Sequence, residues 1–475
     1  MKSIVWFRQD LRLADNPALV YAAMRGAVVP VYILDESAGP HTRLLGAASR
    51  WWLHHSLAAL AKSLGGLVLA QGDPRKLIPE IARKTDAAGV FWNRCYEPHA
   101  IARDSKLKDQ LSSDGFDVAS FNASLLFEPW TVQTKDGSPY KVYSPFWRAC
   151  QRLTVDAPQA APKMDVAKTT GLGVSLKTLD LLPTKPNWAK GFEGVWEPGE
   201  TGAQARLKAF LDDGIDGYAE LRNRPDLPHV SRLSPHLRFG ELSPRQIWAA
   251  CTARAEDDGS LRKDIEKFLA ELGWREFSYH LLYHFPRLPD ENWRRAFDAY
   301  PWANSARHLK AWRRGATGYP IVDAGMRELW TTGYMHNRVR MIVASFLIKH
   351  LRIDWRKGEA WFWDTLVDAD LANNAASWQW VAGSGADAAP YFRIFNPMEQ
   401  GRKFDPDGVY VRRWCPELSR LPDAHLHAPF EAPGEVLQAA GVELGATYPE
   451  PIVEHRAARE AALAGYAKVK AAGQN

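Results

Sequence analysis

The stretch SIVWFRQDLRLADNPALVYAAMRGAVVPVYIL, Ser3–Leu34, indicates how the first part of the chain folds. It opens with a short apolar run, Ser3–Phe7, and closes with a second one, Val28–Leu34, and both are typical of buried strands. Between them ADNPALVYAAM predicts a helix, because Asn16 suits the N-cap and Pro17 suits the first helical position. The order strand, helix, strand predicts a βαβ unit.

The same alternation continues to about residue 125. The helix-like segments AASRWWLHHSLAALAKSLGG, DPRKLIPEIARK and IARDSKLKDQL separate the strand-like runs LVLA, GVFWN and FDVASF. Such alternation predicts a parallel sheet, in which ligands bind at the carboxyl ends of the strands. None of these strands leads into G-x-G-x-x-G or a P-loop, so the sequence indicates no dinucleotide or nucleoside-triphosphate site. We assign residues 1–126 to this Rossmann-like α/β domain.

From residue 127 the pattern changes twice. Residues 127–200 are rich in proline and lack sustained periodicity, which is typical of a long connector, with one helix in SPYKVYSPFWRACQRL. Residues 201–475 contain helical segments such as LRKDIEKFLAELGWREFSYHLLYH and NRVRMIVASFLIKHL, and strand-like runs are nearly absent. The sequence therefore predicts an α/β N-terminal domain with a parallel sheet, an interdomain connector and a large all-α C-terminal domain.

Composition narrows the range of functions. The 475 residues carry a formal net charge of +5, and the four cysteines lie far apart without a C-x-x-C pair. This spacing argues against a disulfide framework, a zinc site or an iron–sulfur cluster, and it fits a reducing cytoplasm. No apolar run reaches membrane-spanning length, and MKSIVWFRQDL is too short and too charged for a signal peptide. We expect a cytoplasmic monomer without a membrane partner.

Two basic segments favour a polyanionic partner. Residues 287–314 contain seven Arg or Lys against three acids, and residues 335–357 contain six against one. Either run alone is compatible with an ordinary solvated surface. Because tryptophans are interleaved with both runs, the combination favours nucleic acid.

Two short motifs allow both a structural and a functional interpretation. In SRLSPHLRFGELSP, Ser234-Pro235 and Ser243-Pro244 each resemble an N-cap followed by a first-position proline. Hydroxyls, Arg232 and free amides at helix starts would suit an anion, although two capped helices explain the stretch equally well. His280 and His284 have the i, i+4 spacing of metal ligands, but on an aromatic helix they are more often packing residues, and no metal is predicted.

The stretch DADLANNAASWQW, Asp368–Trp380, combines acids, amides and indoles. Alanine favours helix, whereas Asn-Asn is unfavourable in a helix interior, and two tryptophans at i, i+2 cannot share one face. If Asp368 or Asp370 is buried, it needs a cation or hydrogen-bond donors, and Arg340 is a plausible partner. Taken alone, the stretch is compatible with a core ion pair and packing.

Five stretches match one known family in the same order along the chain: WFRQDLRLADNPAL, SRLSPHLRFGELSP, ELGWREF, TGYPIVDAGMRELWTTGYMHNRVRMIVASFLIKHLRIDW and DADLANNAASWQWVAGSGADAAPYFRIFNP. They closely resemble the photolyase/cryptochrome flavoproteins, and the resemblance runs from about residue 1 to residue 465. The connector LLPTKPNWAKGFEGVWEPGE resembles the class III bacterial pyrimidine-dimer photolyases. This family implies an α/β domain that can hold an antenna chromophore and a helical domain that buries FAD.

The resemblance implies a set of FAD contacts. Asp368 would pair with Arg340, and Asp370 would meet the ribityl chain or the flavin ring. Asn374 falls where photolyases place a neutral amide against flavin N5, whereas the blue-light receptors of the family often carry Asp or Cys there. The full set implied is Tyr218, Ser231, Arg232, Leu233, Ser234, Arg275, Asn337, Arg340, Asp368, Asp370 and Asn374. Val230 departs from the family pattern, which usually has Thr, so one hydroxyl contact is lost.

The resemblance also implies a pocket for damaged DNA. Flipping a damaged base pair out of the duplex costs less free energy than flipping an intact one, because the damaged pair is already poorly stacked. Glu271 would hydrogen-bond the pyrimidine edge, and Trp274 and Trp380 would form walls on which the bases stack. Asn337 and Met341 would complete the pocket and favour cyclobutane dimers, since (6-4) photolyases generally carry histidines in that region.

Two further sets of residues follow from the same resemblance. The family's chain of indoles, which carries electrons to oxidised flavin, matches Trp378, Trp355 and Trp302. An antenna, either methenyltetrahydrofolate or a deazaflavin, would be lined by Asp35, Glu36 and Arg50. The folate-binding positions of the enterobacterial pattern are occupied here by His99-Ala100 and Asp290, so we expect an antenna that is held differently or is another chromophore.

The resulting hypothesis is a cyclobutane pyrimidine dimer photolyase acting on ultraviolet-damaged DNA. Family members of this kind donate one electron from excited, fully reduced anionic FAD to the lesion, and the protein positions the cofactor and excludes water. One alternative is a cryptochrome-type blue-light receptor without repair activity. A second is a DNA-binding flavoprotein without photochemistry. Light-dependent loss of dimers separates the three.

Overall fold

The computed structural model describes residues 1–37, 43–169, 171–388 and 392–473. The chain divides into two units, each assembled from several segments. The first unit comprises Met1–Asp216, Ser231–Pro286 and Val367–Ala372, and the second comprises Gly217–Val230, Arg287–Leu366 and Asn373–Asn475. The domain boundaries at residues 126 and 200 stay a prediction.

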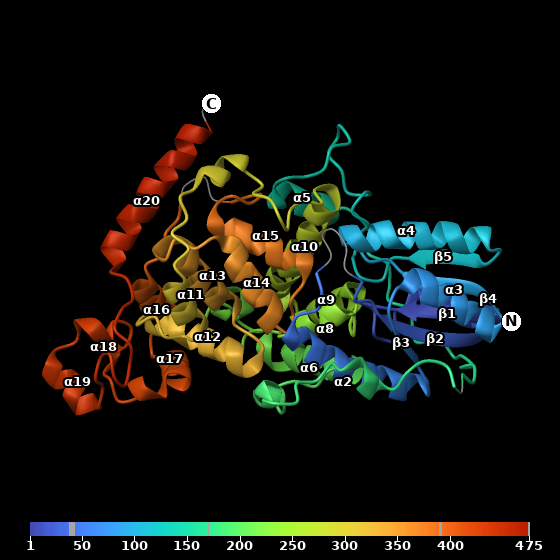
Figure 1. Ribbon diagram of the computed structural model, residues 1–475, viewed down its shortest axis with the longest axis horizontal. Coiled ribbons are helices and arrows are strands. Elements are labelled where there is room, and N and C mark those ends of the chain that lie inside the picture. The colour runs from blue at the N-terminus through green and yellow to red at the C-terminus, as the bar shows by residue number, and fades with distance from the viewer. Residues whose placement is uncertain (38–42, 170, 389–391, 474–475) are drawn as a thin grey trace. The chain divides into compact units, whose positions relative to one another are not determined.

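A five-stranded parallel sheet forms the N-terminal part of the first unit (Figure 1). Its spatial order is β3-β2-β1-β4-β5, so the direction of strand addition reverses at β1, between its neighbours β2 and β4. The strands are β1 (Lys2–Phe7), β2 (Ala27–Leu34), β3 (Val68–Gln71), β4 (Ala87–Asn93) and β5 (Asp117–Phe121). The predicted α/β architecture is confirmed.

Four helices connect these strands: α1 (Pro17–Arg25), α2 (Ala47–Leu64), α3 (Pro74–Thr85) and α4 (Pro98–Ser113). The predicted cap of α1 is confirmed, because Asn16 Oδ1 accepts a hydrogen bond from the Leu19 amide at 3.1 Å. Helix α2 ends at Gly65, whose φ of 72° is a left-handed conformation that glycine adopts without steric cost.

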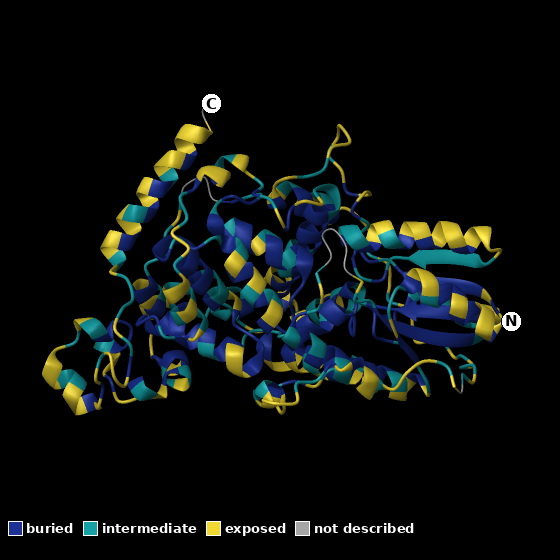
Figure 2. Ribbon diagram, in the orientation of Figure 1, coloured by how far each residue is buried: buried dark blue, intermediate teal, exposed yellow. Residues whose placement is uncertain are grey.

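The sheet buries a different set of side chains on each face. On one face, alternate residues of the strands pack against α3 and α4, because successive side chains of a strand point to opposite faces. This cluster includes Ile4, Trp6, Val29, Val31, Val90, Trp92, Ile78, Ile81, Leu107 and Leu111. On the other face Tyr21 of α1 contacts the ring of Phe91 edge-on, with 4.9 Å between ring centroids. Figure 2 shows the central strands as almost wholly buried.

The carboxyl ends of β1 and β4 carry a buried polar network. Asn93 Nδ2 donates to Asp10 Oδ2 at 2.6 Å, and Arg8 Nη1 pairs with Asp104 Oδ2 at 2.5 Å. None of the four residues is more than 9% exposed. Ligands of open parallel sheets commonly bind where the strand order reverses, but here the chain's own side chains fill that position.

The remainder of the first unit is helical or irregular. The connector region contains α5 (Tyr143–Cys150), which matches the helix predicted there, and two short 3₁₀ turns, η1 (Leu176–Leu179) and η2 (Trp188–Phe192). Further along the chain lie α6 (Glu200–Ala209), the π-helical turn η3 (Phe210–Gly214), α8 (Ser234–Phe239), α9 (Pro244–Asp257), the 3₁₀ turn η4 (Gly259–Leu261) and the long α10 (Arg262–His284).

The second unit contains helices and no strand among its described residues. The helices are α7 (Tyr218–Leu221), α11 (Ala306–Arg313), α12 (Pro320–Thr332), α13 (Asn337–Ser345), α14 (Trp355–Thr365), α15 (Leu371–Ala382, from its third residue), α16 (Pro397–Phe404), α17 (Val409–Trp414), α18 (Asp423–Leu426), α19 (Gly434–Ala440) and α20 (His455–Ala472), with 3₁₀ turns η5 (Arg295–Ala299), η7 (Pro416–Leu418) and η8 (Pro429–Glu431).

One helix differs from the sequence prediction. NRVRMIVASFLIKHL predicts a single helix, whereas α13 ends at Ser345 and continues as the π-helical turn η6 (Phe346–His350). The Leu351 amide bonds to the Phe346 carbonyl at 3.1 Å, five residues back. A π turn inserts one residue into the helical repeat and so redirects the side chains that follow it.

Two chain-wide features complete the fold. Within the described ranges, no helix is both long and apolar enough to cross a membrane. The four cysteines, Cys95, Cys150, Cys251 and Cys415, are free thiols and all are buried.

Candidate functional site

The loop before α8 leads to Ser234, a predicted flavin residue that contacts a second one, Asp368. Ser234 is the first residue of α8 rather than its N-cap, which is Leu233, so the predicted capping role of Ser234 is wrong. Its hydroxyl instead donates to Asp368 Oδ2 at 2.6 Å. Arg232 has a φ of 51°, a left-handed conformation unusual for a residue with a side chain, and such backbone strain is common at ligand sites.

Asp370 also has a buried donor. The Tyr279 hydroxyl donates to its Oδ2, and Tyr279 is only 2% exposed. Burial, followed by the charge of Asp370, raises the pKa of Tyr279 well above its usual range, so the phenol keeps its proton. Arg238 Nε donates to the Ala369 carbonyl at 2.6 Å and holds the backbone between the two aspartates. Sequence reasoning missed both Tyr279 and Arg238.

Helix α10 presents three predicted residues. Glu271 is partly exposed, with a carboxylate oxygen 3.5 Å from Lys267 Nζ. The Trp274 ring stacks on Tyr143 of α5, with 3.7 Å between centroids and 9° between planes. Arg275 donates to the Ser124 carbonyl at 2.8 Å. Trp274 therefore has one face fixed by a second aromatic ring, which suits a rigid wall for a stacked base.

The His280–His284 pair on the same helix belongs to packing. Their ring centroids lie 4.6 Å apart, and His284 Nε2 lies 3.1 Å from the Pro129 carbonyl oxygen. Burial, followed by the neighbouring His284, lowers the pKa of His280 to about 4, although backbone contacts with Pro129 and Tyr140 oppose the shift. Across the described residues no group of three or more His, Cys, Asp or Glu side chains is arranged to hold a metal ion.

In the second unit, α13 carries Asn337, Arg340 and Met341. The helix is capped by His336, whose Nδ1 accepts from the Arg338 amide at 3.2 Å. Arg340 Nε donates to the Met335 carbonyl at 2.7 Å. Asn337 is exposed and Met341 is half-buried, so both side chains are accessible to a ligand.

Asn374 on α15 is held by Glu359 on α14. Its amide nitrogen donates to Glu359 Oε1 at 2.8 Å and to the Glu359 carbonyl at 3.1 Å. Both residues are buried, and these bonds explain how the Asn-Asn sequence is accommodated inside a helix. Because both amide hydrogens are used, the atom that remains for a ligand is the acceptor Oδ1.

Tyr218 begins α7 and is buried. The preceding Gly217 has a φ of 73°, and the Arg222 guanidinium lies 5.5 Å from the Tyr218 ring centroid. The tyrosine is thus held next to a cation, a combination suited to an anionic group.

The three predicted electron-carrying tryptophans differ in exposure. Trp378 is 2% exposed and Trp355 is fully buried, whereas Trp302 is partly exposed. Trp355 Nε1 donates to Asn292 Oδ1 at 2.9 Å. Trp378 contacts Trp312 edge-on at 6.3 Å between centroids, a neighbour that sequence reasoning did not assign.

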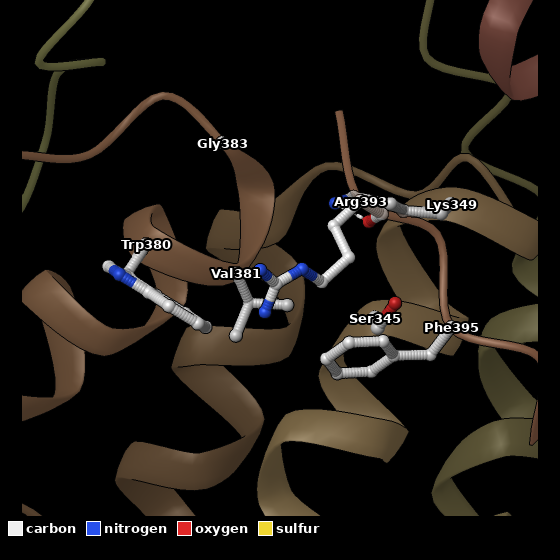
Figure 3. Close-up of a pocket in the computed structure, with 7 residues that line it drawn as sticks. All are labelled: Ser345, Lys349, Trp380, Val381, Gly383, Arg393 and Phe395. Carbon is white, nitrogen blue, oxygen red and sulfur yellow. Dashed lines mark hydrogen bonds between the residues drawn. The ribbon is translucent and has the colours of Figure 1, made fainter. Parts of the chain in front are cut away.

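Trp380 lies two residues after Trp378 and faces a small cavity of about 20 Å³ (Figure 3). Its Nε1 donates to the Asp387 carbonyl at 3.1 Å. The other residues that line the cavity are Ser345, Lys349, Val381, Gly383, Arg393 and Phe395.

The three predicted antenna residues lie near the ends of β2 and α2. Arg50 Nη1 pairs with Glu36 Oε1 at 2.5 Å, and Gln71 Nε2 donates to Glu36 Oε2 at 2.6 Å. The Arg50 hydrogen bond is the main cause that lowers the pKa of Glu36. Asp35 pairs with Arg103 at 2.9 Å, so Glu36 and Arg50 come together while Asp35 has a separate partner.

Comparison with known proteins shows the family of this chain. Residues 3–163 match the family described as DNA photolyase, and residues 268–468 match the FAD binding domain of DNA photolyase. A deoxyribodipyrimidine photo-lyase from Agrobacterium fabrum is 56% identical over 474 residues, covering 98% of each chain. The chain belongs to the DNA photolyase family.

Two further comparisons bear on the kind of DNA photolyase. The crystal structure of a class III photolyase from Agrobacterium tumefaciens has a TM-score of 0.95 and 56% identity, covering 99% of this chain and 98% of that one. Cryptochrome-1 from Arabidopsis thaliana is 40% identical over 95% of this chain and 68% of its own length. The family therefore includes cryptochromes as well as photolyases.

The residues of this chain fit FAD. A reduced flavin carries hydrogen at N5, and Asn374 has an acceptor, not a donor, left for it. Asp368 and Asp370 each accept a hydrogen bond from a hydroxyl, and their remaining carboxyl lone pairs suit ribityl or ring N–H and O–H donors. Arg232 and Arg222 are of the residue type that suits phosphate groups.

Proposed function

We propose that this chain is a deoxyribodipyrimidine photo-lyase, a carbon–carbon lyase that repairs cyclobutane pyrimidine dimers in DNA with light. The observation that carries the proposal is the 56% identity with a deoxyribodipyrimidine photo-lyase over 98% of both chains. The neutral side chain of Asn374 supports repair rather than signalling, because an amide at this position does not repel an anionic flavin as a carboxylate would.

The family resemblance supplies the residues that would hold FAD. Tyr218, Ser231–Ser234 and Arg275 would bind near its phosphates, Asp368 would pair with Arg340, and Asp370 would fix the ribityl chain or ring. When bound, reduced FAD supplies the light-driven electron that splits the dimer. The chain's own part is to orient the cofactor, exclude water and place Asn374 Oδ1 against the N5 hydrogen.

The lesion would bind between aromatic walls. Trp274, fixed by Tyr143, and Trp380 would stack on the bases, and Asn337 and Met341 would complete the pocket. Glu271 would hydrogen-bond the pyrimidine edge and help to stabilise the dimer after it receives the electron. Trp378, Trp355 and Trp302 would return an electron to oxidised FAD.

DNA would be held mainly through its phosphates. The basic runs at 287–314 and 335–357 support binding that weakens with salt and has little sequence preference. Glu36 and Arg50, with Asp35, would line the site of an antenna, methenyltetrahydrofolate or a deazaflavin. We place the protein in the cytoplasm, which the buried free thiols support. We also propose that it is a monomer, and size-exclusion chromatography tests the oligomeric state.

Dimer loss in light tests the function. Ultraviolet-irradiated oligothymidylate is incubated with the reduced, FAD-loaded protein in blue light and in the dark, and remaining dimers are counted. We expect loss in the light alone. Flavin photochemistry without dimer loss would identify a cryptochrome-type receptor, and binding without either would identify a DNA-binding flavoprotein.

Glu271→Ala tests the electronic role of the carboxyl group. Repair per absorbed photon at saturating DNA should fall more than DNA affinity falls. Glu266→Ala, an exposed acid on the same helix α10, is the matched control and should change neither quantity. Equal losses in yield and affinity for Glu271→Ala would contradict the assigned role.

A further inference from the structure

Lys349 is a buried cation that the roles above do not use. It lies on the π-helical turn η6, at the end of the helix that carries Asn337, Arg340 and Met341, and it is 3% exposed. Burial, with a smaller contribution from Arg393, lowers the pKa of Lys349 to about 7. A buried lysine is costly unless its ammonium group has a specific partner, so its contacts indicate what it does.

The partner of Lys349 is a stretch of backbone. Nζ donates to the Arg393 carbonyl at 2.6 Å and lies 4.3 Å from the ring centroid of Phe392. Phe392 in turn stacks on Tyr466 of α20, with 4.6 Å between centroids and 7° between planes. The start of segment 392–395 is therefore fixed by one cationic hydrogen bond and by aromatic contacts.

This segment passes close to Trp380. Figure 3 shows the Arg393 side chain extending from the segment toward Val381, with its guanidinium on the side of the cavity where Trp380 lies. Arg393 is exposed. The side chains that line the cavity include Lys349 and Arg393 and no carboxylate.

We propose that Lys349 is a positioning residue for DNA binding, which holds segment 392–395 so that Arg393 meets a phosphate of the damaged strand beside Trp380. The inference rests on the proposed function and adds a named phosphate contact and its support. The guanidinium is a phosphate donor, while Lys349 contributes through the backbone of Arg393 and touches no substrate. The π turn matters because it inserts a residue between Met341 and Lys349 and so sets where the lysine points.

The main test removes the hydrogen bond from Lys349 Nζ to the Arg393 carbonyl but keeps the approximate volume of the side chain. Lys349→Met is loaded with FAD, and its binding to ultraviolet-irradiated oligothymidylate is followed by fluorescence anisotropy over a range of salt. We expect Kd to rise about tenfold, as for loss of one charge-assisted hydrogen bond. The slope of log Kd against log salt should become smaller by about one phosphate contact. Repair per photon at saturating DNA should stay at the wild-type value.

Three companion variants make the result specific. Lys349→Arg, which keeps a buried donor, should restore most of the affinity. Ser345→Ala is the matched control, because Ser345 lies four residues earlier, lines the same cavity, and its hydroxyl has no hydrogen-bond partner in the described part of the chain. It should bind DNA as the wild type does. Arg393→Gln changes only an exposed side chain, and it should lower affinity and salt slope by the same amounts as Lys349→Met.

The outcomes separate this inference from the proposed function. Wild-type Kd and slope for Lys349→Met, or an unchanged slope for Arg393→Gln, would overturn the inference even if light-dependent repair is intact. If Lys349→Met does not retain FAD, the Arg393→Gln result decides. Failure of the wild type to remove dimers would instead refute the proposed function, and the binding measurements would still report on Lys349.

Discussion

Two serine–proline pairs of the same loop-and-helix region, Ser234-Pro235 and Ser243-Pro244, have the same local sequence and different roles. Ser243 caps α9 with a full capping box, its hydroxyl accepting from the Gln246 amide at 3.0 Å. Ser234 donates to Asp368, 134 residues later in the chain. Local sequence sets which role is possible, and a distant partner decides which one occurs. This distant contact joins two of the residues assigned to the flavin.

The largest effect is expected from removing the distant partner itself. Asp368→Asn keeps the size of the side chain but loses the charge that accepts the Ser234 hydroxyl and would pair with Arg340. FAD binding should weaken by about 1.5–3 kcal/mol, a rise in Kd of roughly 10- to 150-fold. Fluorescence of released FAD measures the occupancy. Asp364→Asn, an exposed acid shortly before it, should retain FAD, and equal losses in both variants would refute the assignment.

Asn374→Asp tests whether the Glu359 contact controls the charge at the flavin. The introduced carboxyl would lie next to Glu359, and two such carboxyls share one proton, which raises the pKa of the pair. Below that pKa the pair carries one negative charge, and above it two. The difference between the flavin reduction potentials of the variant and the wild type, taken at the same pH, should therefore be more negative by about 30 mV or more at about pH 9 than at about pH 6.

Redox titration at both pH values measures this difference. Asn373→Asp is the control, because the preceding residue projects from a different side of α15. A difference from the wild-type potential that is the same at both pH values would show that Glu359 does not share its proton.

The two serines themselves provide the sharpest contrast. Ser243→Ala should lower the free energy of unfolding by about 1 kcal/mol, through the lost cap, and leave FAD affinity unchanged. Ser234→Ala should weaken FAD binding by about 1 kcal/mol, roughly fivefold in Kd, and leave the start of α8 intact. Urea unfolding and FAD titration of both variants check the pair. The comparison fails if the two variants exchange these effects.

The smallest effect on repair is expected at Trp302, whose ring contacts Tyr300 only two residues earlier, at 4.5 Å. Trp302→Phe should abolish most photoreduction of oxidised FAD, yet repair by chemically pre-reduced protein should change by less than about twofold. Trp130→Phe, another partly exposed tryptophan, should leave both rates unchanged. Loss of repair by the pre-reduced variant would remove Trp302 from the electron route.

The same division between local and distant contacts explains what the sequence could predict. The parallel sheet, the Asn16 and Ser243 caps and the long helix α10 follow from periodicity and capping, which operate within a few residues. The flavin residues were named through the family resemblance, because no local rule joins Ser234 to Asp368 or Asn374 to Glu359. Tyr279, Arg238 and the π turn at Phe346–His350 were missed for the same reason: each is defined by a contact or a backbone register that neighbouring residues do not specify.

The buried cysteine thiols can report the order in which the two units of the chain unfold. Burial raises the pKa of Cys95 to about 11 and that of Cys251 to about 12, so neither is a nucleophile in the native protein. Cys95, Cys150 and Cys251 belong to the first unit, and Cys415 belongs to the second. The order in which an alkylating reagent modifies them therefore reports which unit unfolds first, without any added label.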